Sequence, residues 1–473
     1  MGVAQTLIAL GWATGFVVAA KVAHRHVKVF RTLFIPSSVI AGIAALLIGP
    51  QVLGALATSL EWGDPFAGGL VPESVLDVWS AIPGLLINVV FAALFLGKRI
   101  PPLRDIIRIA GPQVALGQSM AWGQYVVGIL LAIAVLQPVF GMNPAAGALI
   151  EIGFEGGHGT AAALESTFAE FDFAEGSDLA LGLATFGLVA GVLSGLAIIN
   201  WGLRTGRIDR ELIEGDGMPA EEEAESLGEF DEREHDQGDP HEDVAIDPLS
   251  VHLGLIAVAI ALGWLLQQGL IALEAATWAR DDGLELFRHI PLFPLAMIGG
   301  LALQIGLTRL GDAGPHVDRA LVNRVSGASL DLVIVTALGT LSLAVLGDNI
   351  APLLILAVAG LTWSVVALLV LAPRIVPDHP YQRGLADFGQ STGMTVTGLL
   401  LVRMVDPDGR TKAMEGFGYK QLLFEPFVGG GLFTAISVPL IVQLGPWPVL
   451  GITAALMVIS MGVGIRFFGP DGR

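Results

Sequence analysis

Cysteine is absent from this chain of 473 residues, which excludes disulfide bonds and thiolate metal sites but assigns no cellular compartment. Charge is also scarce, since Asp, Glu, Lys and Arg together make up 15% of the residues. The HExxH motif that an intramembrane zinc hydrolase would need does not occur. We therefore expect a protein that is not an enzyme, holds no cofactor and has no nucleic-acid partner.

Hydrophobic residues make up 53% of the chain, and its mean hydropathy is +0.70. Apolar runs long enough to cross a bilayer recur along the whole sequence, which predicts an all-α, polytopic membrane protein. The first run, from Val3 to Ala20, has neither a basic leader nor an obvious cleavage site. It is therefore expected to be a retained helix rather than a signal peptide.

About eleven membrane helices are expected, in two sets of five and one extra. The first set falls near residues 3–20, 34–50, 79–97, 109–136 and 179–203. The second falls near 249–273, 292–308, 327–346, 350–372 and 422–444, and the extra helix at 449–468 belongs to a C-terminal segment, 445–473. Residues 1–203 and 249–444 would then form two membrane halves.

The net charge of −19 is concentrated between these halves. The stretch from Asp209 to Asp247 is densely acidic, with Arg210 and Arg233 as its only basic residues. Its low hydrophobicity predicts a disordered linker over residues 204–248 that acts as a solvated spacer, with partner binding or regulation as the alternative.

Lys and Arg should gather in cytoplasmic loops. The loop at 51–79 has no basic residue, whereas the loops on either side of it are basic. The alternation continues to Arg204 and Arg207 beside the acidic segment. It predicts an outside N-terminus and places the linker and the C-terminus in the cytoplasm.

Five spans per half is an odd number, so the halves would enter the membrane from opposite sides, as inverted repeats of secondary transporters do. Each half also holds a polar, glycine-containing stretch that is short for a full crossing. We expect re-entrant hairpins there, an outer one near 144–165 and an inner one near 383–403.

The motif GGHGT at 156–160, followed by ATFGLVAGVLSG at 184–195, resembles the bacterial sodium:glutamate symporter family. Ile35-Pro36 and the Pro426 to Gly431 segment also fit, whereas residues 389–397 depart from the family pattern. The resemblance implies this fold, sodium as the coupling ion, an acidic amino acid as substrate, the inner membrane as location and a homodimer.

The two hairpins supply the candidate site residues. Glycine-rich breaks expose N–H groups that can hold a carboxylate, and a polar side chain at bilayer depth is functional by default. For the substrate, these residues are Glu155, Gly156, Gly157, His158, Gly159, Thr160, Gln390 and Gly393. For sodium, which prefers oxygen ligands, they are Asn88, Ser391, Thr392, Thr395 and Thr397.

Each of these residues also has a simpler interpretation. His158 could donate to a carboxylate, titrate, or bond only to the hairpin backbone. Asn88 could bond between helices instead of to an ion. Ser391 and Thr395 stand at the i, i+4 spacing that places two hydroxyls on one helical face. Glu151 and Glu165 are expected at an aqueous entrance.

The helix at 179–203 carries Gly187, Gly191 and Gly195 on one face, which predicts close packing against a hairpin. The function expected from all these features is sodium-coupled uptake of glutamate or a similar acidic amino acid by alternating access. The alternatives are a proton-coupled transporter of another organic anion and, less favoured, a passive anion channel.

Overall fold

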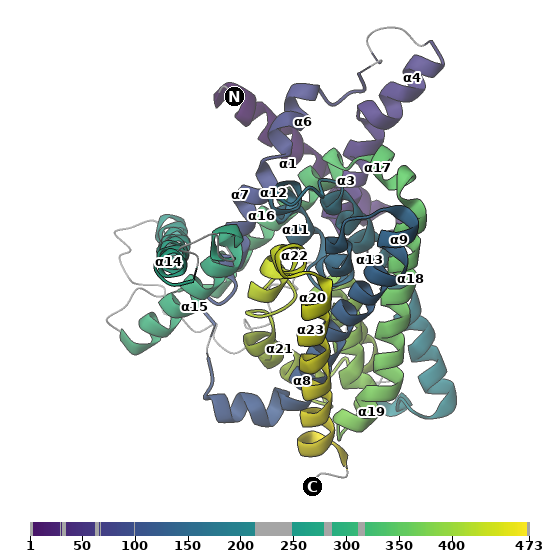
Figure 1. Ribbon diagram of the computed structural model, residues 1–473, viewed down its shortest axis with the longest axis vertical. Helices are drawn as coiled ribbons and strands as arrows, with labels where there is room; N and C mark the ends of the chain where they lie inside the picture. The colour runs from purple at the N-terminus through teal and green to yellow at the C-terminus, as the bar shows by residue number, and fades with distance from the viewer. Residues whose placement is uncertain are drawn as a thin grey trace. The chain divides into compact units, whose positions relative to one another are not determined.

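The computed structural model describes residues 3–28, 30, 35–61, 66, 68–98, 100–212, 248–278, 286–310 and 317–470. Every regular element in these ranges is a helix (Figure 1), so the predicted all-α class is confirmed. Most of the predicted linker, residues 213–247, lies outside the described residues.

The principal helices carry the labels of Figure 1. They are α1 (Val3–His26), α3 (Ser37–Ile48), α4 (Ala55–Ser59), α6 (Glu73–Trp79), α7 (Ile82–Ala93), α8 (Leu103–Leu131), α9 (Gln137–Phe140), α10 (Leu149–Phe154), α11 (Gly157–Ala163), α12 (Glu165–Glu170), α13 (Gly176–Thr205), α14 (Pro248–Ala276), α15 (Leu292–Leu310), α16 (Arg319–Thr340), α17 (Leu343–Asp348), α18 (Ile350–Val366), α19 (Ala372–Ile375), α20 (Pro380–Val405), α21 (Ala413–Phe424), α22 (Leu432–Leu444) and α23 (Pro446–Val463).

Within the described ranges, ten helical stretches are long and apolar enough to cross a membrane. Each overlaps a span expected from hydropathy, so the chain is a multi-pass membrane protein. The ten stretches are Ala4–His26, Ser37–Ser59, Glu73–Ala93, Leu103–Phe140, Gly176–Thr205, Pro248–Ala276, Leu292–Leu310, Arg319–Thr340, Ile350–Ile375 and Pro446–Phe468.

The predicted span at 422–444 is not one helix. Helix α21 ends at Phe424 and α22 begins at Leu432. Between them, Pro426 lacks a backbone donor, and Gly429 and Gly430 have φ values of 69° and 99°, which helical residues do not adopt. The predicted span has the right length and hydropathy, but its backbone is not helical between the two helices. Hydropathy does not detect such a break because it reflects side chains only.

Contacts divide the chain into two compact units. The smaller unit comprises Gly84–Pro101 and Met218–Leu332, where α14 and α15 lie side by side (Figure 1). Small residues allow this approach, because a Cβ atom added to Gly299 would lie 2.2 Å from the Ala259 carbonyl oxygen. The predicted sodium ligand Asn88 belongs to this unit.

The larger unit comprises Met1–Pro83, Pro102–Gly217 and Val333–Arg473. Its helix α8 packs along α21 and α23, and α13 packs along α20. Helix α18 is joined to α8 by the Trp363 indole, which donates a 2.9 Å hydrogen bond to the Met120 carbonyl. Both predicted hairpins lie within this unit.

The chain reverses direction where the outer hairpin is expected, since the Asn143 amide donates a 2.9 Å hydrogen bond to the Phe171 carbonyl at the other end of the segment. A short helical run from Pro144 to Phe154 is followed by α11, and the two are separated by Glu155 and Gly156. Gly157 has a φ of +68°, a left-handed conformation that favours glycine. The polar motif therefore lies at a break between two short helices.

The chain also reverses within α20. Gly393 and Met394 have non-helical dihedral angles of −153°, 36° and 72°, 172°. The segments on either side of them run back along each other, since a Cβ atom added to Gly389 would lie 2.6 Å from the Cα atom of Gly398. Glycine at both positions permits that backbone contact.

The prediction of close packing by the α13 glycines is confirmed. A Cβ atom at Gly187 would lie 2.1 Å from the Thr392 carbonyl oxygen, and one at Gly191 would lie 2.3 Å from the Thr392 hydroxyl. A Cβ atom at Gly195 would meet Leu401 at 2.5 Å. Helix α13 thus lies directly against the inner reversal.

Candidate functional site

The two reversals meet at their tips. The Ser391 hydroxyl donates a 2.6 Å hydrogen bond to Glu155 Oε1, and a Cβ atom at Gly157 would lie 2.3 Å from the Met394 sulfur. The Gln124 amide of α8 donates a 2.6 Å bond to the Ser391 carbonyl. We call the contact between Glu155, Gly157, Ser391 and Met394 the tip junction.

Glu155 is buried at this junction, with 3% of its surface exposed. Its second oxygen, Oε2, has no hydrogen-bond partner among the described residues. Leaving a buried carboxylate oxygen unpaired is costly in a low-dielectric interior. Glu155 is therefore arranged to accept a further donor or a cation.

His158 is buried on α11, and its Nε2 atom lies 3.0 Å from the Thr185 hydroxyl. The Thr185 hydroxyl donates its only hydrogen to the Leu181 carbonyl, so it accepts from His158 Nε2–H. This assignment leaves His158 Nδ1 as an acceptor, and within the described part of the chain Nδ1 has no partner. In this tautomer His158 offers a lone pair, not the N–H that was expected to bind a carboxylate.

The remaining residues of the outer motif are buried around this point. Gly156 lies against Thr160, because a Cβ atom at Gly156 would lie 2.8 Å from Thr160 Cβ. Gly159 is buried on α11 between His158 and Thr160. The glycines of the motif thus permit tight packing of the break.

The inner hydroxyls do not form one ligand face. The reversal at Gly393 and Met394 separates Ser391 from Thr395, so the i, i+4 relation expected of a continuous helix fails. Ser391 faces Glu155, whereas the Thr395 hydroxyl lies 3.4 Å from Glu425 Oε1.

The hydroxyls of Thr392 and Thr397 turn back onto their own chain. Thr392 donates a 2.9 Å bond to the Phe388 carbonyl, and Thr397 donates a 2.5 Å bond to the Gly393 carbonyl. These bonds satisfy the backbone of the reversal. Their oxygens retain lone pairs.

A buried ion pair adjoins the junction. The Lys420 ammonium of α21 donates a 2.6 Å bond to Asp387 Oδ1 and a 2.8 Å bond to Gln390 Oε1. The Gln421 amide also donates to Gln390, at 3.2 Å. Gln390 was expected from the sequence, but Lys420 was not, because only the folded chain brings α21 against α20.

Glu151 is not at an aqueous entrance, which corrects the expectation. It is completely buried, and its carboxylate accepts hydrogen bonds from the Tyr125 hydroxyl at 2.6 Å, the Gly429 amide at 2.8 Å and the Thr434 hydroxyl at 2.8 Å. These donors come from segments remote in sequence. Glu165, in contrast, is exposed.

Asn88 belongs to the smaller unit, whereas the tip junction belongs to the larger one. Its amide nitrogen donates to the Gly84 and Leu85 carbonyls of its own helix, at 2.8 and 3.0 Å. Its Oδ1 atom is buried and has no partner among the residues that the structure describes. The assignment of Asn88 as a sodium ligand therefore stays a prediction.

Residues 389–393 also spell the GxSxG pattern of hydrolase nucleophiles. That pattern needs a serine on a turn from a strand to a helix, next to a base. Ser391 lies inside α20 and donates to a carboxylate instead of to a histidine. The site lacks the geometry of an activated nucleophile.

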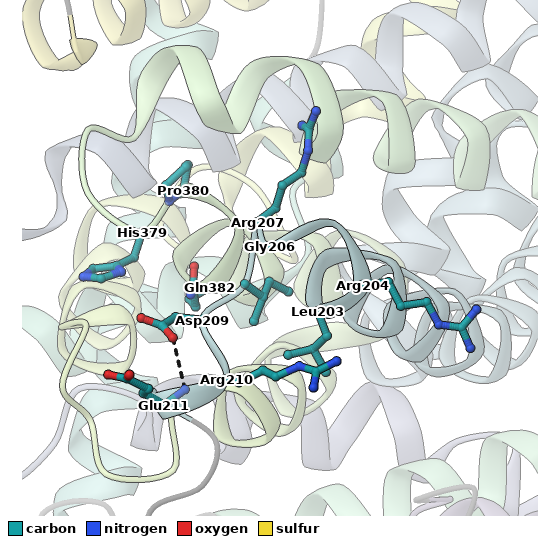
Figure 2. A pocket seen from close by; sticks show the side chains of 11 residues that line it. Leu203, Arg204, Gly206, Arg207, Asp209, Arg210, Glu211, His379, Pro380 and Gln382 are labelled. Carbon is teal, nitrogen blue, oxygen red and sulfur yellow. Dashed lines mark hydrogen bonds between the residues drawn. The ribbon is translucent and has the colours of Figure 1, made fainter.

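A cavity of about 680 Å³ lies elsewhere, where α13 ends and α20 begins. It is lined by residues that include Asp209, Glu211 and Gln382. In Figure 2, Asp209 accepts a hydrogen bond from the Glu211 backbone, and the Arg204 side chain extends away from the acidic groups. No residue predicted for substrate or sodium lines this cavity.

Comparison with known proteins gives consistent matches. A family profile described as Sodium/glutamate symporter matches residues 80–378, a range that contains the outer motif and ends before α20. The chain is 26% identical over 333 residues to the sodium/glutamate symporter of Escherichia coli strain K12, covering 67% of this chain and 75% of the relative.

The match to the sodium/glutamate symporter of Shigella flexneri has the same identity and coverage. The sodium/glutamate symporter of Haemophilus influenzae is 31% identical over 148 residues, which are 28% of this chain and 35% of that relative. The chain therefore belongs to the sodium/glutamate symporter family.

Proposed function

We propose that the protein is a secondary active transporter that carries glutamate or a similar acidic amino acid into the cell together with sodium ions. The observation that carries this proposal is the buried hydrogen bond of 2.6 Å between Ser391 and Glu155, which joins two chain reversals at their tips. The relatives are named for sodium and glutamate together, and this supports the pairing of the two substrates.

Sodium needs several hard oxygen ligands. The tip junction offers Glu155 Oε2, which has no partner among the described residues, and the Ser391 hydroxyl beside it. Sodium would replace the unfavourable burial of an unpaired anion with a compensated one. Thr392 and Thr397 would bind sodium through the remaining lone pairs of their hydroxyl oxygens. Thr395 would contribute to the sodium site through its contact with Glu425.

The substrate would bind next to the ion. An amino acid carries an ammonium group, which can donate to His158 Nδ1 in the tautomer that Thr185 selects. The left-handed break at Gly157 leaves no side chain between the outer motif and Met394. Gln390 and Gly393 would contribute from the inner reversal.

Transport would proceed by alternating access. The halves 1–203 and 249–444 would be inverted repeats, so one reversal is reached from outside and the other from inside. Movement of the hairpin-bearing helices would then open the tip junction to each side in turn. We place the protein in the inner membrane as a homodimer, with its N-terminus outside and both the C-terminus and the acidic linker in the cytoplasm.

The runner-up is coupling to protons, because the unpaired oxygen of Glu155 would also accept a proton. Proteoliposomes separate the two functions when sodium and proton gradients are imposed one at a time. We expect labelled glutamate to accumulate under an inward sodium gradient alone. Accumulation under a proton gradient alone would establish the runner-up, and equilibration without accumulation would indicate a channel.

A further inference from the structure

The Lys420–Asp387 pair has no role in the proposed function so far. Both side chains are fully buried, and the ammonium lies 2.6 Å from Asp387 Oδ1. It also lies 4.0 Å from the centre of the Phe424 ring, a favourable position for a cation. Gly117 of α8 leaves the necessary space, since a Cβ atom there would lie 2.5 Å from Lys420 Nζ.

Asp387 is only half satisfied in this pair. Its Oδ1 atom accepts from Lys420, but its Oδ2 atom is buried without a partner in the described part of the chain. A buried ion pair retained only for stability should have its remaining lone pairs satisfied. The free oxygen indicates that Asp387 also binds a further group.

The pair is close in the chain to the tip junction. Gln390 accepts a 2.8 Å hydrogen bond from Lys420, and the next residue, Ser391, donates to Glu155. The Gln390 side chain and the peptide bond from Gln390 to Ser391 therefore connect Lys420 to the tip junction. The cation is positioned beside the site where an anionic substrate is expected.

We infer that Lys420 binds the side-chain carboxylate of the substrate, and that Asp387 is the internal anion which occupies Lys420 when the carrier is empty. On loading, the substrate carboxylate replaces Asp387 at the ammonium, and the released Asp387 carboxylate binds a sodium ion. This inference rests on the proposed function and identifies the group that recognises an acidic side chain.

The exchange keeps the buried charge balanced. In the empty carrier, the positive charge of Lys420 is matched by Asp387. In the loaded carrier, Lys420 is matched by the substrate carboxylate and Asp387 by sodium. At this pair, neither state leaves Lys420 or Asp387 without an opposite charge in the low-dielectric interior, whereas binding of the anion or of the cation alone would do so. Coupling then follows from charge balance.

The test separates two fluxes of the Asp387→Asn variant in proteoliposomes. Exchange of internal for external glutamate uses only loaded carriers, but net uptake also needs the empty carrier to return. Without Asp387 the empty carrier holds an unpaired ammonium, so we expect net uptake to fall roughly a hundredfold relative to exchange. Equal loss of both fluxes in inserted protein would overturn the inference.

Asp406→Asn is the matched control, because Asp406 is another buried aspartate and directly follows α20. Its carboxylate accepts from the Arg410 and Thr411 backbone amides and from the Thr411 hydroxyl, which makes it a loop cap. We expect exchange and net uptake of this variant to change in the same proportion. A selective loss of net uptake here would also overturn the inference.

Binding to purified protein gives a readout that needs no gradient. Asp387→Asn should bind glutamate at least as tightly as the parent, with a weaker dependence on sodium, whereas Lys420→Gln should lose glutamate binding. Loss of binding in folded Asp387→Asn would contradict the exchange of anions. If the parent proves proton-driven, the sodium coupling fails, but the flux ratio still decides the roles of Asp387 and Lys420.

Discussion

Four buried polar side chains near the tip junction each keep one atom unpaired. They are Gln124 at Oε1, Glu155 at Oε2, His158 at Nδ1 and Asp387 at Oδ2, with no partner for these atoms in the described ranges. Each unpaired group costs free energy in a protein interior. Their concentration near one contact between two reversals is the residue-level basis for placing substrate and ions there.

Replacing His158 with alanine removes the acceptor for the substrate ammonium. A hydrogen bond to a charged group contributes about 1.5–3 kcal/mol, so we expect glutamate affinity to fall by roughly 10- to 100-fold with insertion retained. Uptake titrations in proteoliposomes measure the change. His379→Ala is the control, because His379 is exposed. Parent-like affinity in a well-inserted His158→Ala protein would exclude this role.

Individual residues were predictable only in part. The outer motif can be recognised in the sequence, because His158 and Glu155 lie among glycines between two apolar runs. The roles of Lys420 and Glu151 could not be recognised in this way, because their hydrogen-bond partners are distant in sequence. Gly429, for example, donates to Glu151 from a remote segment. The expected pairing of Ser391 with Thr395 failed because spacing assumes a continuous helix.

At the level of elements, glycines set how closely helices approach the reversals. In Gly187→Ala, the new methyl group would lie 2.1 Å from the Thr392 carbonyl oxygen, a backbone atom that cannot turn aside. Overpacking of this kind costs about 1–3 kcal/mol. We expect a lower thermal midpoint and lower uptake, measured on purified and reconstituted protein.

Gly182→Ala on the same helix is the comparison, because its nearest neighbour is the Leu346 side chain at 3.1 Å. That side chain can shift by a few tenths of an ångström. We expect a smaller loss of stability and nearly normal uptake. Equal effects of the two substitutions would mean that contact with the inner reversal is unimportant.

Helices were predictable where length and hydropathy sufficed, as for Gly176–Thr205 against the expected 179–203. The break between α21 and α22 was missed because the surrounding run is apolar on both sides. Left-handed glycines such as Gly430 interrupt a helix without lowering hydropathy. Pro426 and the glycine triplet are the local signal that could have revealed it.

At the scale of the whole molecule, hydropathy alone predicted a multi-pass helical protein. The two contact-defined units do not coincide with the expected repeats, since Gly84–Pro101 groups with Met218–Leu332. Segments that contact one another need not belong to the same repeat, so the two divisions of the chain can differ. The inverted repeats at 1–203 and 249–444 therefore stay a prediction.

The acidic linker provides a test at this scale. Deleting Met218 to Glu242 should leave uptake within a few-fold of the parent if this segment is the solvated spacer that its composition predicts, because such a spacer contributes reach and not specific contacts. Initial uptake rates, normalised to inserted protein, measure the effect. A variant with the same residues in scrambled order is the control. Loss of uptake in both variants, with normal insertion, would indicate a regulatory or docking role.

The sodium dependence of Glu155→Gln tests most directly whether the tip junction binds the coupling ion. Glutamine removes the charge while nearly preserving shape, and Glu165→Gln, at an exposed position of α12, is the matched control. Uptake at saturating glutamate would be measured against sodium concentration. We expect Glu155→Gln to need roughly tenfold or more sodium for half-maximal uptake, because a charged ligand is lost, with the control unchanged. A parent-like sodium curve in inserted Glu155→Gln would contradict a sodium site at the tip junction.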